Sequence, residues 1–378
     1  NRVSESVLIV AGEQSGDKYG ASVVRHYLTN SPKTHFFGIG GVHMKDAGVE
    51  ILHPMEDLSV VGIFEVVKHL FRIRNIFSHV IQTAKDRRPS AAVLIDSPDF
   101  NLRLARRLNA LNIPVLYYIS PTVWAWRRRR LNRIKKSVFK MLLIFPFEEK
   151  IYAEKEIAAV FVGHPLIERM QPGKSKQEFY SKYKLDPGKK TIALLPGSRR
   201  SEIRYHAPVL VKTLPRILEN YDVQFLMIKA DSIPEDFLRE HFPNSKDFKL
   251  VTEDVYDALS SSDLALSACG TANLECALLG TPVIAFYRLM PLTYFLGVKL
   301  VKISDYSIVN ILAGQKIIPE LIQKQFTSKG LYKEVNKFLT SPRSQEEMIR
   351  HFEKIRKDLG EKNASENVSR ILNDLLNH

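Results

Sequence analysis

Cysteine is scarce in this chain, and no long hydrophobic run occurs in it. Its 378 residues include two cysteines, Cys269 and Cys276, whose spacing fits neither a metal-binding pair nor a disulfide framework. Such sparing use is typical of a reducing compartment such as the cytoplasm. The longest nearly apolar stretch, residues 290–303, is interrupted by two lysines, whereas a membrane-spanning helix needs roughly 18 apolar residues. We therefore predict neither structural disulfides nor a transmembrane helix.

Several motifs that identify a reaction type are also absent. Residues 12–18 (GEQSGDK) resemble a phosphate loop, but they have three residues between the glycines and lack the Lys-Ser/Thr ending. Residues 38–43 begin like a dinucleotide fingerprint, but His43 stands where the third glycine is required. Zinc-protease, nucleophile-elbow and D-x-D metal motifs do not occur. NTP hydrolysis, hydride transfer, serine-esterase chemistry and metal-dependent sugar transfer are therefore not supported, and we predict no metal and no cofactor.

Positive charge is in excess, with a formal net charge of +14 at pH 7. This excess indicates an anionic partner, such as nucleic acid, a membrane surface or a phosphorylated substrate. The densest basic clusters are residues 127–136, 199–204 and 68–74. The third is interleaved with apolar side chains from Val66 to Phe77. That pattern is typical either of a helix that rests on an anionic bilayer or of a half-buried helix with a solvated basic side.

Both tryptophans lie in residues 120–128 (SPTVWAWRR), directly after a predicted buried strand at residues 115–119. Two indole rings beside an arginine cluster form an apolar surface with a positive rim. Such a surface suits an amphiphile that carries an anionic group. Ordinary packing is the alternative role for Trp124 and Trp126.

Strand-like and helix-like segments alternate throughout the chain. Short apolar runs, typical of strands buried on both faces of a parallel sheet, lie at residues 7–11, 34–38, 91–95, 115–119, 141–145, 160–162, 191–195, 223–228, 264–267 and 283–286. A polar stretch rich in proline, glycine and lysine, residues 171–190, separates the first six runs from the last four. The predicted fold class is α/β, with two doubly wound Rossmann-like domains that face a cleft.

The same pattern predicts the domain boundaries. We place an N-terminal domain at residues 1–170 and a C-terminal domain at residues 171–344. Residues 345–378 are predicted to form helices, the last of which has apolar residues at clean helical spacing. We expect these helices to pack back onto a domain or onto the partner subunit of a homodimer.

In the second domain, residues 194–199 (LLPGSR) end a predicted strand and lead into a helix. Gly197 allows the backbone to approach a ligand closely, and Ser198 is placed to cap the helix. Arg199 is placed to pair with a phosphate group. A glycine turn at a strand end is common, so this motif alone indicates a phosphate site only weakly.

A second strand–turn–helix motif follows at residues 267–275 (SACGTANLE). The helix start at Gly270 and Thr271 favours a phosphate, because free N–H groups and the helix dipole point there. Glu275, on the opening turn, is placed to accept hydrogen bonds from ribose hydroxyls. Two such motifs on successive βα units of one domain predict a nucleoside diphosphate site.

In the first domain, residues 95–101 (IDSPDFN) follow an apolar strand, where open α/β sheets place ligands. Asp96 comes directly off the strand and is the better candidate for a general base. For Asp99 we favour a role as the cap of the following helix. Three polar residues after the first strand are candidates to line the same cleft: Glu13, Ser15 and Asp17.

These motifs together resemble the lipid-A-disaccharide synthase family, glycosyltransferases of the two-Rossmann GT-B architecture. The most specific matches are residues 12–17 and 120–126, and further matches lie at residues 61–66, 95–101, 146–148, 163–165, 195–199, 270–275 and 309–314. The resemblance therefore covers almost the whole chain. Gln14 and Asn273 depart from the family pattern, and neither has a role assigned here.

The resemblance implies an inverting transfer of 2,3-diacylglucosamine from UDP to the 6-hydroxyl of 2,3-diacylglucosamine 1-phosphate (lipid X). The products are UDP and the lipid A disaccharide 1-phosphate. Asp96 is then the base, alone or with Asp99 or Glu13. The departing UDP is stabilised by Arg199 and by the helix start at Gly270 and Thr271, without a metal. Two further residues are implied at the nucleotide: Glu275 at the ribose, and Asn310 nearby.

Because both substrates are acylated, the resemblance also implies a function for the apolar, basic surfaces. The resemblance assigns residues 61–77 and 292–300 to membrane contact or to the acyl chains. The tryptophan run, with Trp124 as a substrate-binding candidate, serves there or supports the cleft from beneath. We expect a cytoplasmic protein that is peripherally associated with the cytoplasmic face of the inner membrane.

Two other functions compete with this interpretation. A UDP-sugar epimerase or a transferase for a soluble sugar could use the same fold, but neither needs the apolar, basic helix of the first domain. An RNA-binding protein would explain the positive charge and would bind oligonucleotides in a salt-sensitive way. It leaves the glycine turns and Asp96 unexplained, so we predict no nucleic-acid partner.

Overall fold

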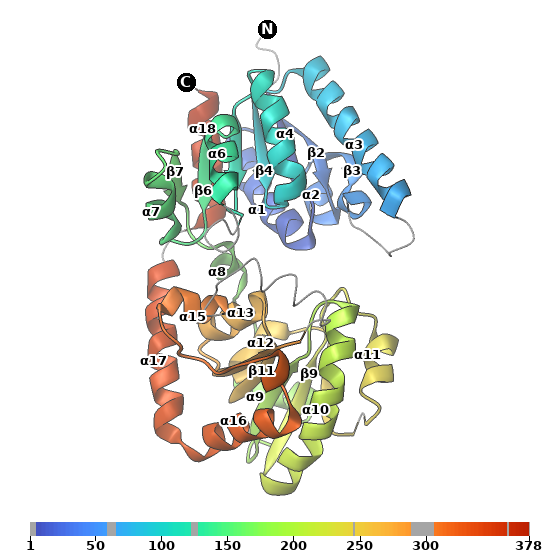
Figure 1. Cartoon of the computed structure of the whole chain (residues 1–378), viewed down its shortest axis with the longest axis vertical. Coiled ribbons are helices and arrows are strands. Elements are labelled where there is room, and N and C mark those ends of the chain that lie inside the picture. The colour runs from blue at the N-terminus through green and yellow to red at the C-terminus, as the bar shows by residue number, and fades with distance from the viewer. Residues whose placement is uncertain are drawn as a thin grey trace. The chain divides into compact units, whose positions relative to one another are not determined.

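Two parallel β-sheets, each flanked by helices, make up the described part of the chain (Figure 1). The computed structural model describes residues 5–58, 66–121, 128–244, 246–288, 306–360 and 363–377, without the side chains of residues 66–70 and 128–130. Contacts group the chain into unit 1, with Asn1–Glu168 and Leu359–His378, and unit 2, with Arg169–Asp358. The predicted α/β class with two parallel sheets is confirmed.

Unit 1 contains a seven-stranded parallel sheet in the order β3-β2-β1-β4-β5-β6-β7. The strands are β1 (Ser6–Ala11), β2 (His35–Gly40), β3 (Glu50–Pro54), β4 (Ala91–Ile95), β5 (Val115–Tyr118), β6 (Lys140–Leu143) and β7 (Ala159–Phe161). The direction of winding reverses between β1 and β4, which pair directly. The carboxyl ends of these two strands therefore meet at the point where open α/β sheets bind ligands.

Both faces of this sheet carry a hydrophobic core, as its apolar strands predict. Leu8 and Val10 of β1 face one core, and Val7 and Ile9 face the other. The helices of unit 1 are α1 (Gln14–Asn30), α2 (Val42–Asp46), α3 (Val66–Arg87), α4 (Pro98–Ala110), α6 (Arg128–Ser137), α7 (Glu148–Ala153), α8 (Pro165–Arg169), which runs one residue into unit 2, α18 (Ala364–Leu376) and the 3-10 turn η1 (Met55–Leu58).

The C-terminal helix α18 packs against α1 of unit 1. Val368 and Leu372 are fully buried on its inner face and belong to the same core as Val7 and Ile9. The side-chain amide of Asn367 donates a 2.8 Å hydrogen bond to a backbone carbonyl near the end of β7. This helix is thus part of unit 1, although it lies far from β1 in the sequence.

Unit 2 contains a six-stranded parallel sheet in the order β10-β9-β8-β11-β12-β13. The strands are β8 (Lys190–Leu195), β9 (Val223–Ile228), β10 (Phe248–Val251), β11 (Leu264–Ala268), β12 (Val283–Tyr287) and β13 (Glu320–Ile322). The helices are α9 (Lys176–Tyr183), α10 (Arg200–Asn220), α11 (Glu235–His241), α12 (Val255–Ser261), α13 (Thr271–Leu278), α15 (Ile308–Ala313), α16 (Ser328–Thr340), α17 (Pro342–Leu359) and the 3-10 turn η3 (Gln323–Gln325). The winding reverses between β8 and β11, which repeats the arrangement of β1 and β4.

Three strands were not predicted from the sequence: β3, β10 and β13. Each lies at an edge of its sheet. Polar side chains interrupt them, such as His53 in β3 and Lys249 in β10, and their burial is incomplete. These three edge strands have less of their surface covered than a central strand, so they lack the continuous apolar run that predicts a buried strand, whereas the edge strand β7 keeps a short one.

Part of the predicted membrane-contact surface lies outside the described residues. This holds for residues 61–65, for residues 292–300 and for Trp124. Helix α3, which contains the remainder of the first segment, is amphipathic and exposes Phe71 on its surface. Among the helices that the structure describes, none is both long and apolar enough to cross a membrane.

Leu372→Ala is expected to lower the free energy of unfolding by about 2–5 kcal/mol, because truncation of a fully buried leucine leaves a cavity. Asp374→Ala, at an exposed position of the same helix, should change it by less than about 0.5 kcal/mol. Urea unfolding of both variants measures these changes. Equal losses at the two positions would show that α18 does not cover this core.

Candidate active site

Two turns meet at the carboxyl ends of β1 and β4 in unit 1. The chain leaves β1 through Gly12 and Glu13 and enters α1, and it leaves β4 through Asp96 and Ser97 and enters α4. A Cβ atom on Gly12 would collide with the Oγ atom of Ser97. Glycine at this position is therefore what allows the two turns to approach each other closely.

Asp96 and Ser97 both adopt left-handed backbone conformations, with φ of 48° and 44°. Such conformations cost about 1–3 kcal/mol for residues other than glycine and persist where the surroundings hold them. The amide of Asn101 donates to the carbonyl oxygens of Ile95 and Asp96, at 3.1 and 3.0 Å. The hydroxyl of Tyr117 donates to the same Asp96 carbonyl at 2.5 Å. Two buried side chains thus hold this turn.

The carboxyl group of Asp96 is in a setting that makes it more basic than usual. Burial raises the pKa of Asp96 to about 6, and the negative charge of Glu13 contributes to the rise. A backbone hydrogen bond from Ser97 acts in the opposite direction. A base whose pKa lies near the working pH transfers protons efficiently. The predicted role of Asp96 as a base therefore has electrostatic support.

The other candidates in unit 1 occupy different surroundings. Glu13 and Ser15 are exposed at the sheet edge, and Asp99 is exposed on the first turn of α4. The N-cap residue of α4 is Ser97, so the predicted capping role of Asp99 is wrong. Asp99 nevertheless lies in the first turn of α4, where the helix dipole favours a negative charge.

Asp17 is fully buried, and its carboxylate is bound by backbone N–H groups. Its carboxylate accepts hydrogen bonds from the N–H groups of Gly41, His43 and Met44 at 2.7, 3.1 and 3.0 Å. The ring nitrogen Nδ1 of His43 lies 2.9 Å from it. The carboxylate therefore joins α1 to the start of α2, and the structure gives it a structural role instead of a place on the open sheet edge.

In unit 2, the turn after β8 is organised around Glu202. Gly197 has φ of 140°, and a Cβ atom there would lie 2.7 Å from Oε2 of Glu202. The same oxygen accepts hydrogen bonds from the N–H groups of Ser198 and Arg199, at 2.9 and 3.3 Å. The N-cap residue of α10 is Arg199, so the predicted capping role of Ser198 is wrong.

Glu202 therefore occupies the N–H groups of Ser198 and Arg199, which a ligand at the glycine turn would otherwise meet. The side chain of Arg199 is 73% exposed, and its guanidinium is 3.9 Å from Oε1 of Glu202. The hydroxyl of Tyr287, at the end of β12, donates to that same oxygen at 3.1 Å. The guanidinium of Arg199, more than the backbone of the turn, is the group placed to meet an anion.

His206 holds this turn from beneath. Its Nδ1 lies 2.6 Å from the carbonyl oxygen of Pro196, and the N–H of Arg288 donates to its Nε2 at 3.0 Å. These two partners require a neutral ring with hydrogen on Nδ1. Burial lowers the pKa of His206, which favours this neutral form. The ring packs against Phe286 and Phe326, so one buried histidine joins the ends of β8 and β12.

The second predicted motif of unit 2 lies beside the first, because β11 pairs with β8. Gly270 is the N-cap residue of α13, and both Gly270 and Thr271 are exposed at its start. Glu275 is half-buried on this helix; burial raises the pKa of Tyr256 to about 12, and the charge of Glu275 contributes. Asn273 is fully buried, and its amide donates to the carbonyl of Ala268 at 3.3 Å.

Asn310 is also buried, and protein groups satisfy its side chain. Its amide nitrogen donates to the carbonyl of Ile318 at 3.1 Å and to Glu320 at 2.8 Å. Its oxygen accepts from the N–H groups of Ile317 and Ile318 at 2.8 and 2.9 Å. Asn310 therefore stabilises the segment before β13, and α15, on which it lies, packs against α13.

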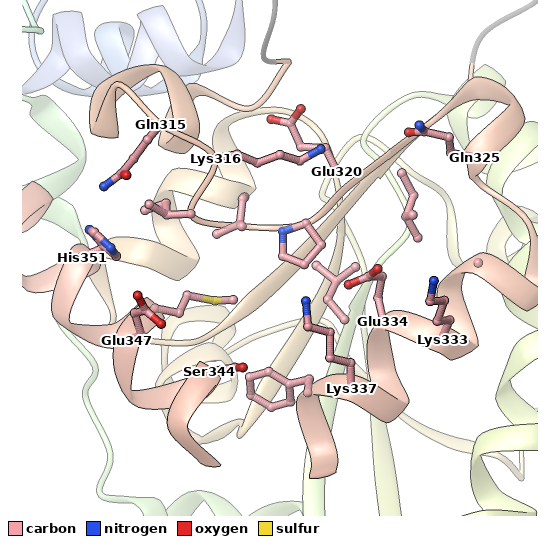
Figure 2. Close-up of a pocket in the computed structure, with 18 residues that line it drawn as sticks. Gln315, Lys316, Glu320, Gln325, Lys333, Glu334, Lys337, Ser344, Glu347 and His351 are labelled. Carbon is pink, nitrogen blue, oxygen red and sulfur yellow. The ribbon is translucent and has the colours of Figure 1, made fainter. Parts of the chain in front are cut away.

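A cavity of about 740 Å³ in unit 2 contains none of the predicted site residues (Figure 2). Figure 2 shows Lys316 and Lys337 at opposite sides of it, with Glu334 beside Lys337 and Glu347 on α17. Acidic and basic side chains alternate around its wall, so its lining selects neither anions nor cations. In the described ranges, no group of three or more His, Cys, Asp or Glu side chains is arranged to hold a metal ion.

The comparison with protein families decides among the enzymes that this geometry allows. The family described as lipid-A-disaccharide synthetase matches residues 7–372. This chain belongs to the lipid-A-disaccharide synthase family. The synthase of Geobacter sulfurreducens is 38% identical over 375 residues, covering 99% of this chain and 98% of that one. The synthase of Solibacter usitatus is 39% identical over 342 residues, or 90% of each chain. The predicted glycosyltransferase family is thereby confirmed.

Solved structures support the GT-B type of fold. MurG from Acinetobacter baumannii aligns with a TM-score of 0.58 and 16% identity, covering 98% of this chain and 100% of that one. UDP-GlcNAc 2-epimerase from Neisseria meningitidis aligns with a TM-score of 0.60 and 12% identity, covering 98% and 99%. At these identities the likeness concerns the fold alone. Because an epimerase shares this fold, the family match, and not the fold, separates the candidate enzymes.

His206→Leu is expected to lower the free energy of unfolding by about 1–3 kcal/mol, because it leaves the buried carbonyl of Pro196 and the N–H of Arg288 without partners. His206→Asn keeps a donor near the position of Nδ1 and should recover part of the loss. Urea unfolding measures both effects.

The matched control is His241, whose Nδ1 lies 2.9 Å from the carbonyl of Phe237 at a partly exposed site. His241→Leu should cost less than His206→Leu, because water can replace the lost partner there. Equal losses in the two leucine variants would show that His206 is not a special link between β8 and β12.

Proposed function

We propose that this protein transfers 2,3-diacylglucosamine from UDP-2,3-diacylglucosamine to the 6-hydroxyl of lipid X, with inversion at the anomeric carbon. Membership of the synthase family over residues 7–372 is the observation that carries this proposal. Two features support it chemically. Asp96, with its raised pKa, lies where the winding of unit 1 reverses, and Arg199 is exposed in unit 2. The products are the lipid A disaccharide 1-phosphate and UDP.

Asp96 is the proposed base. Its carboxylate takes the proton of the acceptor hydroxyl while that oxygen attacks the anomeric carbon, and the UDP leaves from the opposite face. The bonds from Asn101 and Tyr117 hold the backbone of Asp96, so the carboxylate is oriented before substrate arrives. Glu13, whose charge raises the pKa of Asp96, makes it a stronger base.

Charge builds on UDP as it leaves, and unit 2 supplies the groups that we propose to stabilise it. Arg199 is cationic and exposed, and the N-terminus of α13 at Gly270 and Thr271 presents N–H groups to a phosphate. Glu275 is proposed to bind the ribose. Ser198 and Gly197 shape the turn that positions Arg199.

The acyl chains of both substrates require an apolar surface. We propose that α3, with Phe71 63% exposed, contacts the acyl chains or the cytoplasmic face of the inner membrane. Its basic side chains would then lie near anionic headgroups. Such contact would make the protein a peripheral membrane protein, and binding to vesicles that contain anionic lipid measures it.

UDP release tests the reaction with the purified protein, UDP-2,3-diacylglucosamine and lipid X in detergent with EDTA. We expect release that depends on lipid X and survives EDTA. In Asp96→Asn it should fall by about 10²–10⁴-fold, the usual contribution of a general base. Asp46→Asn, at an exposed position of α2, should leave it unchanged. Turnover of UDP-N-acetylglucosamine without release from the acylated donor would identify a soluble-sugar enzyme instead.

The pH dependence tests the role of Asp96 separately. The ratio kcat/KM should rise with pH and be half-maximal at about 6, because the base acts when deprotonated and its pKa is raised to about 6. Glu13→Gln removes a charge that contributes to this rise, so the midpoint should move to lower pH. Asp46→Asn should not move it. An unmoved midpoint in Glu13→Gln would show that Glu13 does not act on Asp96.

A further inference from the structure

A groove of about 560 Å³ lies on unit 1 beside β3, η1 and α3, apart from the turns described above. Helix α3 runs next to the edge strand β3 (Figure 1). The polar side chains at the groove are His53, Asp57, Arg72, Asn75 and His79, and Phe71 contributes apolar surface. A groove with two imidazoles, a guanidinium and an amide has the donors that a phosphate group requires.

The two histidines form a pair. Nε2 of His53 lies 2.7 Å from Nδ1 of His79, and the rings meet edge to face with centroids 4.9 Å apart. Two neutral rings carry two N–H hydrogens, and one of these occupies the shared bond. Only one of the two outer nitrogens can then donate. One additional proton makes both outer nitrogens donors, so the pair gains a charge and a second donor in a single step.

Arg72 supplies the permanent charge. One of its terminal nitrogens bonds to the carboxylate of Asp57, which orients the guanidinium. Arg72 is itself 60% exposed, and a guanidinium has five N–H donors, so one bond to Asp57 leaves donors for a ligand. The carboxylate of Asp57 partly offsets the charge of Arg72. A preference for a doubly charged ligand therefore comes from the histidine pair, which gains a positive charge when it takes up a proton.

The elements that form the groove also contact the elements around the candidate base. Leu58, which follows Asp57 in η1, has its Cδ1 atom 3.5 Å from the place that a Cβ on Gly12 would occupy. On the other side, Phe77 of α3 packs against Phe100 of α4, with centroids 5.6 Å apart. Neighbours of the lining residues on η1 and α3 thus pack against the turn after β1 and against α4, the helix that follows the proposed base.

We propose that this groove binds the phosphate monoester of the acceptor lipid, with Arg72, His53 and His79 as its donors and Phe71 against an acyl chain. The proposal rests on the proposed function, because that function supplies an acceptor with a phosphate and two acyl chains. A monoester is a dianion near neutral pH, whereas a phosphodiester headgroup carries one charge. A dianion gains more than a monoanion from the positive charge that the histidine pair acquires on protonation, so the groove favours the monoester.

Binding of the monoester is coupled to uptake of a proton by the histidine pair. Burial lowers the pKa of His53, and the neighbouring His79 lowers it further. Asp57 raises it and Arg72 lowers it again. A dianion beside the outer nitrogens favours the protonated pair, in which both of them donate. The complex therefore holds one proton more than the free protein.

The test uses the full chain and dodecyl phosphate as the probe, with its methyl ester as the diester control, titrated calorimetrically at about pH 7.5, where the monoester is mainly a dianion. Arg72→Gln and the double variant His53→Gln/His79→Gln should weaken binding of dodecyl phosphate at least about tenfold, as expected for lost hydrogen bonds to a charged group. The diester should bind less tightly than the monoester to the parent protein.

Matched controls come from exposed residues outside the groove. Arg106→Gln on α4 and His26→Gln on α1 should bind dodecyl phosphate as the parent does. Titration in buffers of different ionisation enthalpy should show proton uptake by the parent and none by the double histidine variant. Arg72 and His79 are exposed and His53 is half-buried, so a thermal scan of each variant checks that it unfolds at the temperature of the parent.

Enzyme kinetics separate this proposal from the proposed function. In the groove variants, KM should rise for lipid X but not for the UDP-linked donor or for an acceptor without its phosphate. If the parent releases no UDP but binds dodecyl phosphate through these residues, the proposed transfer reaction is contradicted while the phosphate site is supported. Equal binding of monoester and diester, or unaltered binding in the variants, would overturn the phosphate site.

Discussion

Parallel pairing of β1 with β4, and of β8 with β11, is the constraint on which the candidate chemistry depends. Each pair brings together two strand ends that are far apart in the sequence. The turns at these ends can approach each other only with little side-chain bulk between them, which Gly12 provides in unit 1. The residues proposed for proton transfer and for nucleotide binding all lie in these four turns or in the helices that directly follow them. The helices and outer strands serve to bury and fix them.

Buried polar side chains hold the turns in both units. Asn101 lies after β4 and Asn273 after β11, and each donates its amide to a carbonyl at the end of its strand. Glu202 lies on the helix that follows β8 and accepts bonds from the N–H groups of the turn after that strand, and Asp17, on the helix that follows β1, does the same for the turn after β2. A buried side chain with backbone partners costs free energy when it is removed, so such residues make the turns rigid. Rigid turns keep the proposed functional groups in place between turnovers.

Secondary structure could be predicted where the local pattern of apolar residues reflects how deeply a segment is buried. Central strands such as β4, with five consecutive buried residues, carry a continuous apolar run because both faces are covered. Edge strands β3, β10 and β13 carry no such run and were missed. Helix caps were predicted wrongly at Ser198 and Asp99 because a suitable residue type does not decide which residue occupies the N-cap position.

The sequence by itself determined the α/β class, the family and the turns that carry Asp96 and Arg199, because strand burial and the motifs at strand ends are local properties. Tertiary structure decided which side chains those turns depend on. Tyr117 and His206 gave no signal, since each acts through a partner that is far from it in the sequence and follows a different strand. It also decided that Asp17 and Asn310 face backbone groups, since the N–H and carbonyl positions around them exist only after the chain has folded.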